Sequence, residues 1–179
     1  MLRLWLPALL WLAVIAWQSV ALSMSETSRF ILPLLHVLLP SGTPAQILFL
    51  HVLLRKAGHF VAYSILGLLL YRAWWGTLLW QASRIASPSA TPGWKTTLTV
   101  WSARAAALAL TGTILVASLD EFQQSIRNNR TGTIADVLLD SAGGWFIQML
   151  LLAISRRRIR YSPSITRSER SRVSASSRQ

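Results

Sequence analysis

The sequence predicts an all-α, polytopic membrane protein: a bundle of four transmembrane helices with a short interfacial helical segment between the first two spans. Of its 179 residues, 53% are apolar and 13% are charged, a balance that favours membrane spans over a soluble domain. Four apolar runs approach the roughly 20 residues that a helix needs to cross a bilayer. Eight of the eighteen basic residues follow Ser155, as is typical of a cytoplasmic segment beside a membrane.

A net charge of +12 can also indicate a nucleic-acid-binding protein. Here the charge is concentrated at one end of an apolar chain that leaves no folded soluble domain. We therefore predict no nucleic-acid partner and take the lipid bilayer as the surface that the basic segment meets. The chain has no cysteine, which excludes disulfides and thiolate metal sites.

The first span is predicted over residues 4–22, an apolar run that carries three tryptophans. Pro7 lies near its start, where a proline disturbs a helix least. A cleaved signal peptide is the rival interpretation, because Arg3 precedes the run and small residues follow it. The run is long for the apolar core of a signal peptide, so we expect a retained membrane anchor.

Residues 23–55 are mixed in character. Ser23–Arg29 is polar and is predicted to be a loop. The apolar run 30–40 is bounded by prolines and is too short to cross, so we expect it to lie at the membrane interface. Thr43 and Pro44 suit the N-cap and the first position of the next helix. Whether residues 30–54 enter the membrane is left open.

The second span is predicted over 56–76, and a polar loop is predicted over 77–97. Lys56, His59 and Tyr63 are spaced so that all three share one face of this helix. Gly67 continues that face and would let a neighbouring helix approach closely. Alone, Lys56 would be an interface lysine and His59 a hydrogen-bonded histidine.

The third span is predicted from about Thr97 to Leu119, and the fourth over 134–154. The third is rich in small residues that suit close helix packing in lipid, namely Ala105, Ala109 and Gly112. In the fourth, Asp136 and Asp140 are four residues apart and share a face with Gly143. Thr133 and Asp136 resemble a capping box. Asp140 lies about 9 Å into the helix, beyond the reach of capping, and is expected to have a partner.

The distribution of basic residues predicts the orientation. Four spans put both termini on one side, where thirteen lysines and arginines fall, against five on the other side. By the positive-inside rule, we predict an inner (cytoplasmic) membrane protein with both termini in the cytoplasm. The domain boundary is predicted at residue 155, with a basic, disordered tail over 156–179.

Polar residues between the third and fourth spans and on one face of the second span are expected to lie together at one side of the membrane. Ionisable residues in or beside spans are costly and usually pair, face a bundle interior or line a water-filled cavity. Such a cluster could perform general acid–base chemistry, bind a hard cation through oxygens, or lock the bundle through ion pairs. With Asp120 and Gln124 on one helix face, its members are Lys56, His59, Tyr63, Asp120, Glu121, Gln124, Arg130 and Asp136.

Three motifs carry a family resemblance. They are KAGHFVAY at 56–63, DEFQQ at 120–124 and RTGTIAD at 130–136, the last followed by Gly143 and Gly144. They resemble the K-x-x-H-F-x-x-Y, D-E-x-x-Q and R-x-G-S-x-x-D motifs of VanZ-like bacterial membrane proteins. The resemblance makes residues 1–155 a VanZ-like transmembrane domain, with its motif-bearing core over 56–150.

The chain departs from the family pattern at two points. Asp140 stands where an asparagine is expected, and Asn128 and Asn129 precede Arg130 where Pro-Gly is usual. The first departure adds an acidic residue inside a span. The resemblance implies a role in the cell envelope, because the founding member of the family is associated with low-level resistance to the glycopeptide teicoplanin.

The expected function is to bind or modify an envelope component, such as a lipid-linked precursor, at the outer face of the inner membrane. Asp120, Glu121 and His59 are the candidates for proton transfer. Lys56 and Arg130 are the candidates for an anionic head group, with Tyr63, Gln124 and Asp136 beside them. No residue is assigned as a metal ligand and no cofactor is predicted. A small ion- or proton-coupled transporter module and a non-catalytic accessory protein remain as alternatives, so whether the protein is an enzyme is left open.

Overall fold

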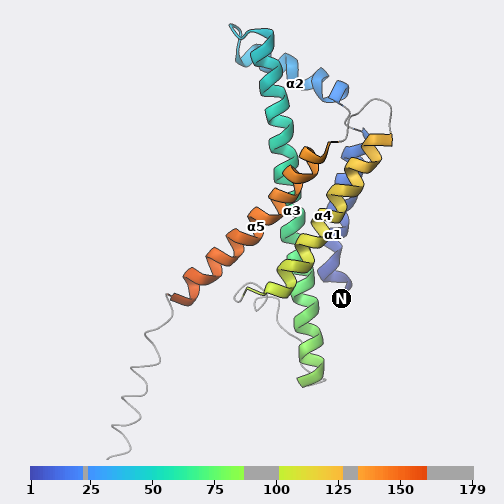
Figure 1. Ribbon diagram of the computed structural model, residues 1–179, viewed down its shortest axis with the longest axis vertical. Helices are drawn as coiled ribbons and strands as arrows, with labels where there is room; N and C mark the ends of the chain where they lie inside the picture. The colour runs from blue at the N-terminus through green and yellow to red at the C-terminus, as the bar shows by residue number, and fades with distance from the viewer. Residues whose placement is uncertain (22–23, 87–100, 127–132, 161–179) are drawn as a thin grey trace, which may run out of the picture.

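A computed structural model describes residues 1–21, 24–86, 101–126 and 133–160 (Figure 1). These residues form helices and connecting turns, with no strand among them. Four of the helices are long and apolar enough to cross a membrane, and a shorter one lies between the first two of them. The helices are α1 (Leu2–Ala21), α2 (Met24–Leu38), α3 (Pro44–Ala86), α4 (Ala103–Ile126) and α5 (Ile134–Arg160). The predicted fold class is therefore confirmed.

Helix α3 is the axis of the molecule, and all four other helices contact it (Figure 1). Its 43 residues make it about 65 Å long at about 1.5 Å per residue, twice the roughly 30 Å of a bilayer's hydrocarbon core. Its start is fixed as predicted. The backbone N–H of Thr43 donates to Gln46 Oε1 (2.9 Å), and the Gln46 N–H donates to Thr43 Oγ1 (3.3 Å), which is a capping box.

Two predicted loops are wrong where the structure describes them. The segment Ser23–Arg29 is helical from Met24 onward, and 77–86 of the predicted loop 77–97 belongs to α3. Neither helical stretch contains Gly or Pro, so polarity alone was the evidence for a loop. The start of the second stretch is also in contact with another helix, because Trp5 Nε1 on α1 donates to Thr77 Oγ1 (3.1 Å). The remainders of the two predicted loops lie outside the described residues.

Other helix boundaries differ from the predicted ones by a few residues. Helix α4 begins at Ala103 rather than Thr97 and continues to Ile126, so Asp120–Gln124 is helical. Helix α5 begins at the predicted residue 134 and runs to Arg160, five residues beyond the predicted domain boundary. Residues 161–179 lie outside the described part of the chain.

The directions of α1, α4 and α5 follow from their contacts with α3. Trp5 near the start of α1 contacts Thr77 late in α3, and Trp11 donates to the carbonyl oxygen of Ala62 earlier in α3, so α1 is antiparallel to α3. Tyr63 contacts Asp120 late in α4, and Tyr71 accepts a hydrogen bond from the backbone N–H of Ser102, so α4 is antiparallel as well. Helix α5 is parallel to α3, because its start lies beside Lys56 and its middle beside Gly67. The start of α1 and the end of α5 therefore lie at the same end of the bundle (Figure 1).

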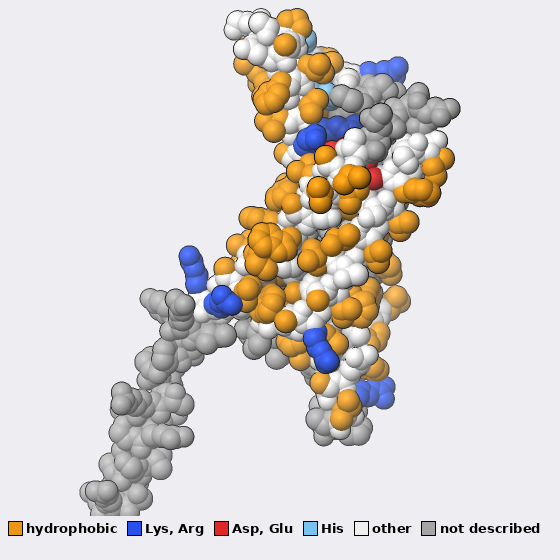
Figure 2. All heavy atoms as spheres, viewed as in Figure 1, with side chains coloured by type: hydrophobic (Ala, Val, Ile, Leu, Met, Phe, Trp, Pro, Cys, Tyr) orange, Lys and Arg blue, Asp and Glu red, His pale blue; other side chains and the backbone are white. Residues whose placement is uncertain are grey.

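Small residues let the helices approach closely, as predicted. A Cβ on Gly67 would lie 3.1 Å from Cα of Gly144, and one on Gly143 would strike the carbonyl oxygen of Phe60. Ala105 and Ala109 are fully buried in α4. The outer surface is apolar: hydrophobic side chains cover most of the described face in Figure 2, with basic side chains toward the ends. That pattern suits helices that face lipid.

Candidate functional site

The polar stripe on α3, formed by Lys56, His59 and Tyr63, faces two acidic residues on α5. Lys56 Nζ lies 3.3 Å from Asp136 Oδ1, and His59 Nδ1 lies 3.5 Å from Asp140 Oδ2. The first pair is partly exposed, with half of the Lys56 side chain accessible. The second is largely enclosed, because the Asp140 side chain is 0% exposed and that of His59 is 32% exposed. The expected partner of Asp140 is thus His59.

The same stripe reaches α4 through Tyr63. Its hydroxyl donates to Asp120 Oδ2 at 3.3 Å, and both residues are buried. Gln124, one turn after Asp120, is also buried, and its Nε2 has no hydrogen-bond partner within the described segments. The predicted shared face of Asp120 and Gln124 is therefore the face that α4 turns toward the bundle interior.

Adjacent carboxylates on α4 have different surroundings. Asp120 contacts Tyr63, whereas Glu121 Oε2 accepts a hydrogen bond from the backbone N–H of Thr133 (3.1 Å), just before α5. Thr133 also caps α5: its hydroxyl donates to Asp136 Oδ2 (2.7 Å), and the Asp136 N–H donates to Thr133 Oγ1 (3.3 Å). Glu121 therefore ties the end of α4 to the start of α5. Asp136 is both a capping residue and the ion-pair partner of Lys56.

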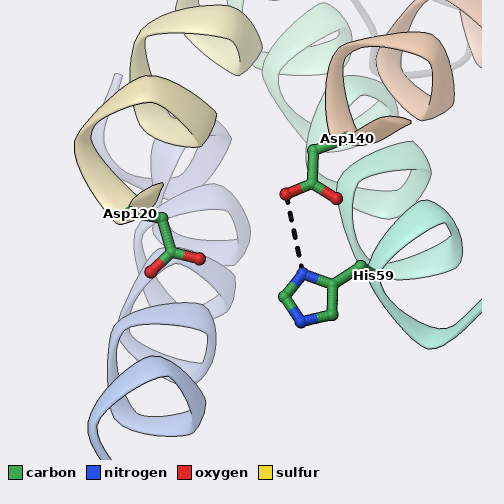
Figure 3. A group of neighbouring side chains, drawn as sticks. All are labelled: His59, Asp120 and Asp140. Carbon is green, nitrogen blue, oxygen red and sulfur yellow. Dashed lines mark ion pairs between the residues drawn. The ribbon is translucent and has the colours of Figure 1, made fainter. Parts of the chain in front are cut away.

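His59, Asp120 and Asp140 come together from three helices (Figure 3). Each offers one potential ligand atom, and these atoms all lie within 4.8 Å of one another. In Figure 3 the three side chains point toward a common space, with the imidazole of His59 beneath the carboxylate of Asp140. Together they supply an imidazole nitrogen and two carboxylates, groups that can move protons or bind a cation.

A cavity of about 280 Å³ adjoins this group. Its polar lining includes Arg55, His59 and Asp120, while Trp11 and Ile15 on α1 form part of an apolar wall. The cavity lies at the late end of α1 and α4, because Gln18 and Ser19 also line it. It is therefore at the end of the bundle opposite the start of α1. The remaining lining residues are Thr27, Gly58, Val61, Ala62, Tyr63 and Ile65.

Comparison with family models gives a match over most of the chain. A model of the VanZ/LLP1 family matches residues 4–155, a range that covers most of each of the four apolar helices and all the predicted site residues. The chain belongs to the VanZ/LLP1 family. Neither the comparison with curated proteins nor that with solved structures finds a match. The resemblance seen in the three motifs is confirmed, and the protein is a membrane protein of this family.

Within this VanZ/LLP1 chain, most of the predicted site residues lie near one another. Asp140 was expected to have a partner but was not among the predicted site residues, yet it is the most deeply buried member of the group. Its position six residues into an apolar helix was the available signal. Arg55 was also missed, although it stands one turn before His59 and both line the cavity. Arg130 lies outside the described residues.

Proposed function

We propose that this VanZ/LLP1 protein acts at the outer face of a bacterial inner membrane. There its cavity binds the anionic head group of a lipid-linked envelope component, and glycopeptide sensitivity changes as a consequence. The observation that carries this proposal is the cavity itself, which joins an arginine, a histidine and an aspartate to an apolar wall. That composition fits an amphiphile with a charged head and an apolar chain.

The size and position of the cavity support a head-group site. Its volume of about 280 Å³ is just below the ~300–1,000 Å³ of small-ligand pockets, so it suits a head group rather than a whole lipid. Arg55 offers the planar, forked donor geometry that binds phosphate oxygens in pairs. The exposed apolar surface of α1, including Leu10 and Trp17, gives an attached acyl or prenyl chain a path in the bilayer.

If the bound component is modified, His59 and Asp120 are the residues we assign to proton transfer. Both line the cavity, and the buried carboxylate of Asp140 lies 3.5 Å from Nδ1 of His59. Glu121 does not line the cavity and holds the backbone before α5, so we assign it a positioning role. Lys56, paired with Asp136, is likewise assigned to the neighbouring helix contact.

Binding can be tested with the full-length protein in nanodiscs. A fluorescent polyprenyl diphosphate would be titrated into the wild type, Arg55→Gln and Arg72→Gln. Arg72 is a matched control, since it is an exposed arginine on the same helix outside the cavity. We expect the affinity to fall at least about tenfold in Arg55→Gln only, because one charge-assisted contact is lost. Equal affinities in all three proteins would refute the head-group site.

Orientation needs a separate experiment, which the absence of cysteine from the chain makes simple. Asn129→Cys and Ser89→Cys would each be labelled in intact cells with a membrane-impermeant thiol reagent. Labelling at 129 alone is expected, because the count of basic residues predicts that the segment containing 129 faces outward and the segment containing 89 faces the cytoplasm. Labelling at 89 alone would put the cavity in the cytoplasm and favour the transporter alternative, which predicts ion-dependent flux in proteoliposomes.

A further inference from the structure

The group formed by His59, Asp120 and Asp140 has a geometry that proton transfer alone does not explain. Asp140 is fully buried, yet neither of its carboxylate oxygens accepts a hydrogen bond from any residue in the described parts of the chain. Its approach to His59 is 3.5 Å, longer than the about 2.7–3.2 Å of an N–H···O hydrogen bond. A buried carboxylate without donors is costly, so an additional ligand is expected beside it.

The distances fit two ligand atoms that share one metal ion. Atoms each about 2.0 Å from a tetrahedral ion are about 3.3 Å apart, close to the 3.5 Å between His59 Nδ1 and Asp140 Oδ2. Asp120 offers a carboxylate oxygen within 4.8 Å of one possible ligand atom on each of the other two residues. Coordination therefore requires the Asp120 carboxylate or the His59 ring to move by about 1.5 Å or less. The 3.3 Å contact between Asp120 and Tyr63 is itself long, so little is lost by that movement.

Charge favours a cation at this position. Asp120 and Asp140 are both at most 8% exposed, and the two carboxylates come from different helices toward the same space (Figure 3). The lysine on the stripe, Lys56, is engaged with Asp136 instead. Two carboxylates that face each other in a poorly hydrated place repel, and a divalent cation between them removes both the repulsion and the lack of donors.

We propose that His59, Asp120 and Asp140 bind one divalent transition-metal ion, with Zn²⁺ preferred. An imidazole nitrogen among the ligands argues against Mg²⁺ and Ca²⁺, which take oxygen ligands, and Zn²⁺ binds such sites more tightly than Mn²⁺. Three protein ligands leave a coordination position on the cavity side, as in catalytic zinc sites. In this inference His59 and Asp120 act as metal ligands in place of the proton-transfer role assigned to them above. The inference rests on the proposed function only for the head group that would occupy the open position.

The ion would act as a Lewis acid toward a phosphoryl or carbonyl oxygen of the bound head group. Arg55, on the same cavity wall as His59, would hold the remaining anionic oxygens. Glu121 would keep the end of α4, and with it Asp120, in place through its hydrogen bond to the N–H of Thr133. The tight contact of Gly143 with Phe60 would fix α5, which carries Asp140, against α3, which carries His59.

The test is direct metal binding by the full-length protein in detergent after removal of metals with a chelator. Zn²⁺ alone is titrated by calorimetry, and bound metal is counted by mass spectrometry after dialysis. We expect one equivalent per chain in the wild type. Asp140→Asn and His59→Phe should each weaken binding by at least about 100-fold. Asp136→Asn, which removes a carboxylate one turn away on the same helix, should leave binding unchanged.

Co²⁺ gives a second readout, since its visible absorption reports the number and type of ligands. The wild type should show a tetrahedral or five-coordinate spectrum that His59→Phe abolishes. The proposal is overturned if the chelator-treated wild type binds no Zn²⁺, or if Asp140→Asn and His59→Phe both bind it as the wild type does. Should Asp140→Asn fail to fold, His59→Phe decides alone, because His59 is partly exposed and its substitution keeps both carboxylates in the chain.

The metal titration tests the metal site and the lipid titration tests the head-group site, so either proposal can be refuted while the other stands. Stoichiometric Zn²⁺ binding with no response of lipid affinity to Arg55→Gln would keep the metal site and refute the head-group site. Arg55-dependent lipid binding that persists without stoichiometric Zn²⁺ would keep the proposed function and refute the metal site.

Discussion

The two halves of the interface between α3 and α5 hold the helices together in different ways. At the end near the start of α5, the contacts are between charged side chains, Lys56 with Asp136 and His59 with Asp140. One to three turns later they are close contacts of backbone and small residues, such as Gly67 against Gly144. Apolar helices surrounded by lipid chains have no hydrophobic driving force for association, so close packing must stabilise the half that contains Gly67 and Gly144. The charged half is free to carry chemistry.

The largest effect is expected in the packed half, from Gly143→Ala. The added Cβ would strike the carbonyl oxygen of Phe60 and lie 3.1 Å from Ser64 Oγ, so the helices must separate. We expect a loss of about 3 kcal/mol in the free energy of unfolding, measured by denaturation with dodecyl sulfate in mixed micelles.

Gly58→Ala is the matched control for that measurement, because a Cβ there meets nothing within 4 Å. It should be neutral or slightly stabilising, since alanine is the better helix former. Equal destabilisation by the two substitutions would show that loss of glycine, rather than the close approach of α5 to α3, determines the effect.

An intermediate effect is expected for the enclosed pair in the charged half. In the presence of a chelator, His59→Leu should cost about 2 kcal/mol of stability, because Asp140 is then left buried without a partner. The double variant His59→Leu, Asp140→Leu should recover part of that loss, since the uncompensated charge is gone. A double variant as unstable as the sum of both single variants would indicate that the two residues are not coupled.

The smallest effect is expected for the partly exposed pair. Lys56→Met should cost less than about 1 kcal/mol, because water screens the pair and half of the lysine side chain is accessible. Raising the salt concentration to 1 M should abolish the difference from the wild type. A larger, salt-independent loss would mean that Lys56 belongs with His59 in the enclosed part of the interface.

Helix spacing predicted much of this arrangement. The shared face of Lys56, His59 and Tyr63 follows from 3.6 residues per turn, and the same rule puts Asp136, Asp140 and Gly143 on one face of α5. What spacing does not give is the relative position of the two faces. That Lys56 meets Asp136 while His59 meets Asp140 depends on the parallel course of α3 and α5 and on the contact of Gly143 with Phe60.

The loops were predicted less well, because polarity is weak evidence for the end of a helix. Glycine and proline are the stronger signals, and they are missing from the segments where helices α2 and α3 outlast the predicted bounds. Where a capping residue was present, as at Thr43 and Thr133, the predicted start of the helix was correct.

The sequence by itself determined that the protein is a helical membrane protein of the VanZ/LLP1 family, because hydropathy, helical period and motif order are local properties of the chain. Only the tertiary structure decided which polar residues meet. Asp120 contacts Tyr63, whereas its neighbour Glu121 contacts the backbone of Thr133. Asp140 lies beside His59, and Arg55 lines the cavity. The physical reason is that a contact between helices depends on their crossing and register, which close packing of small residues sets at positions far along the chain.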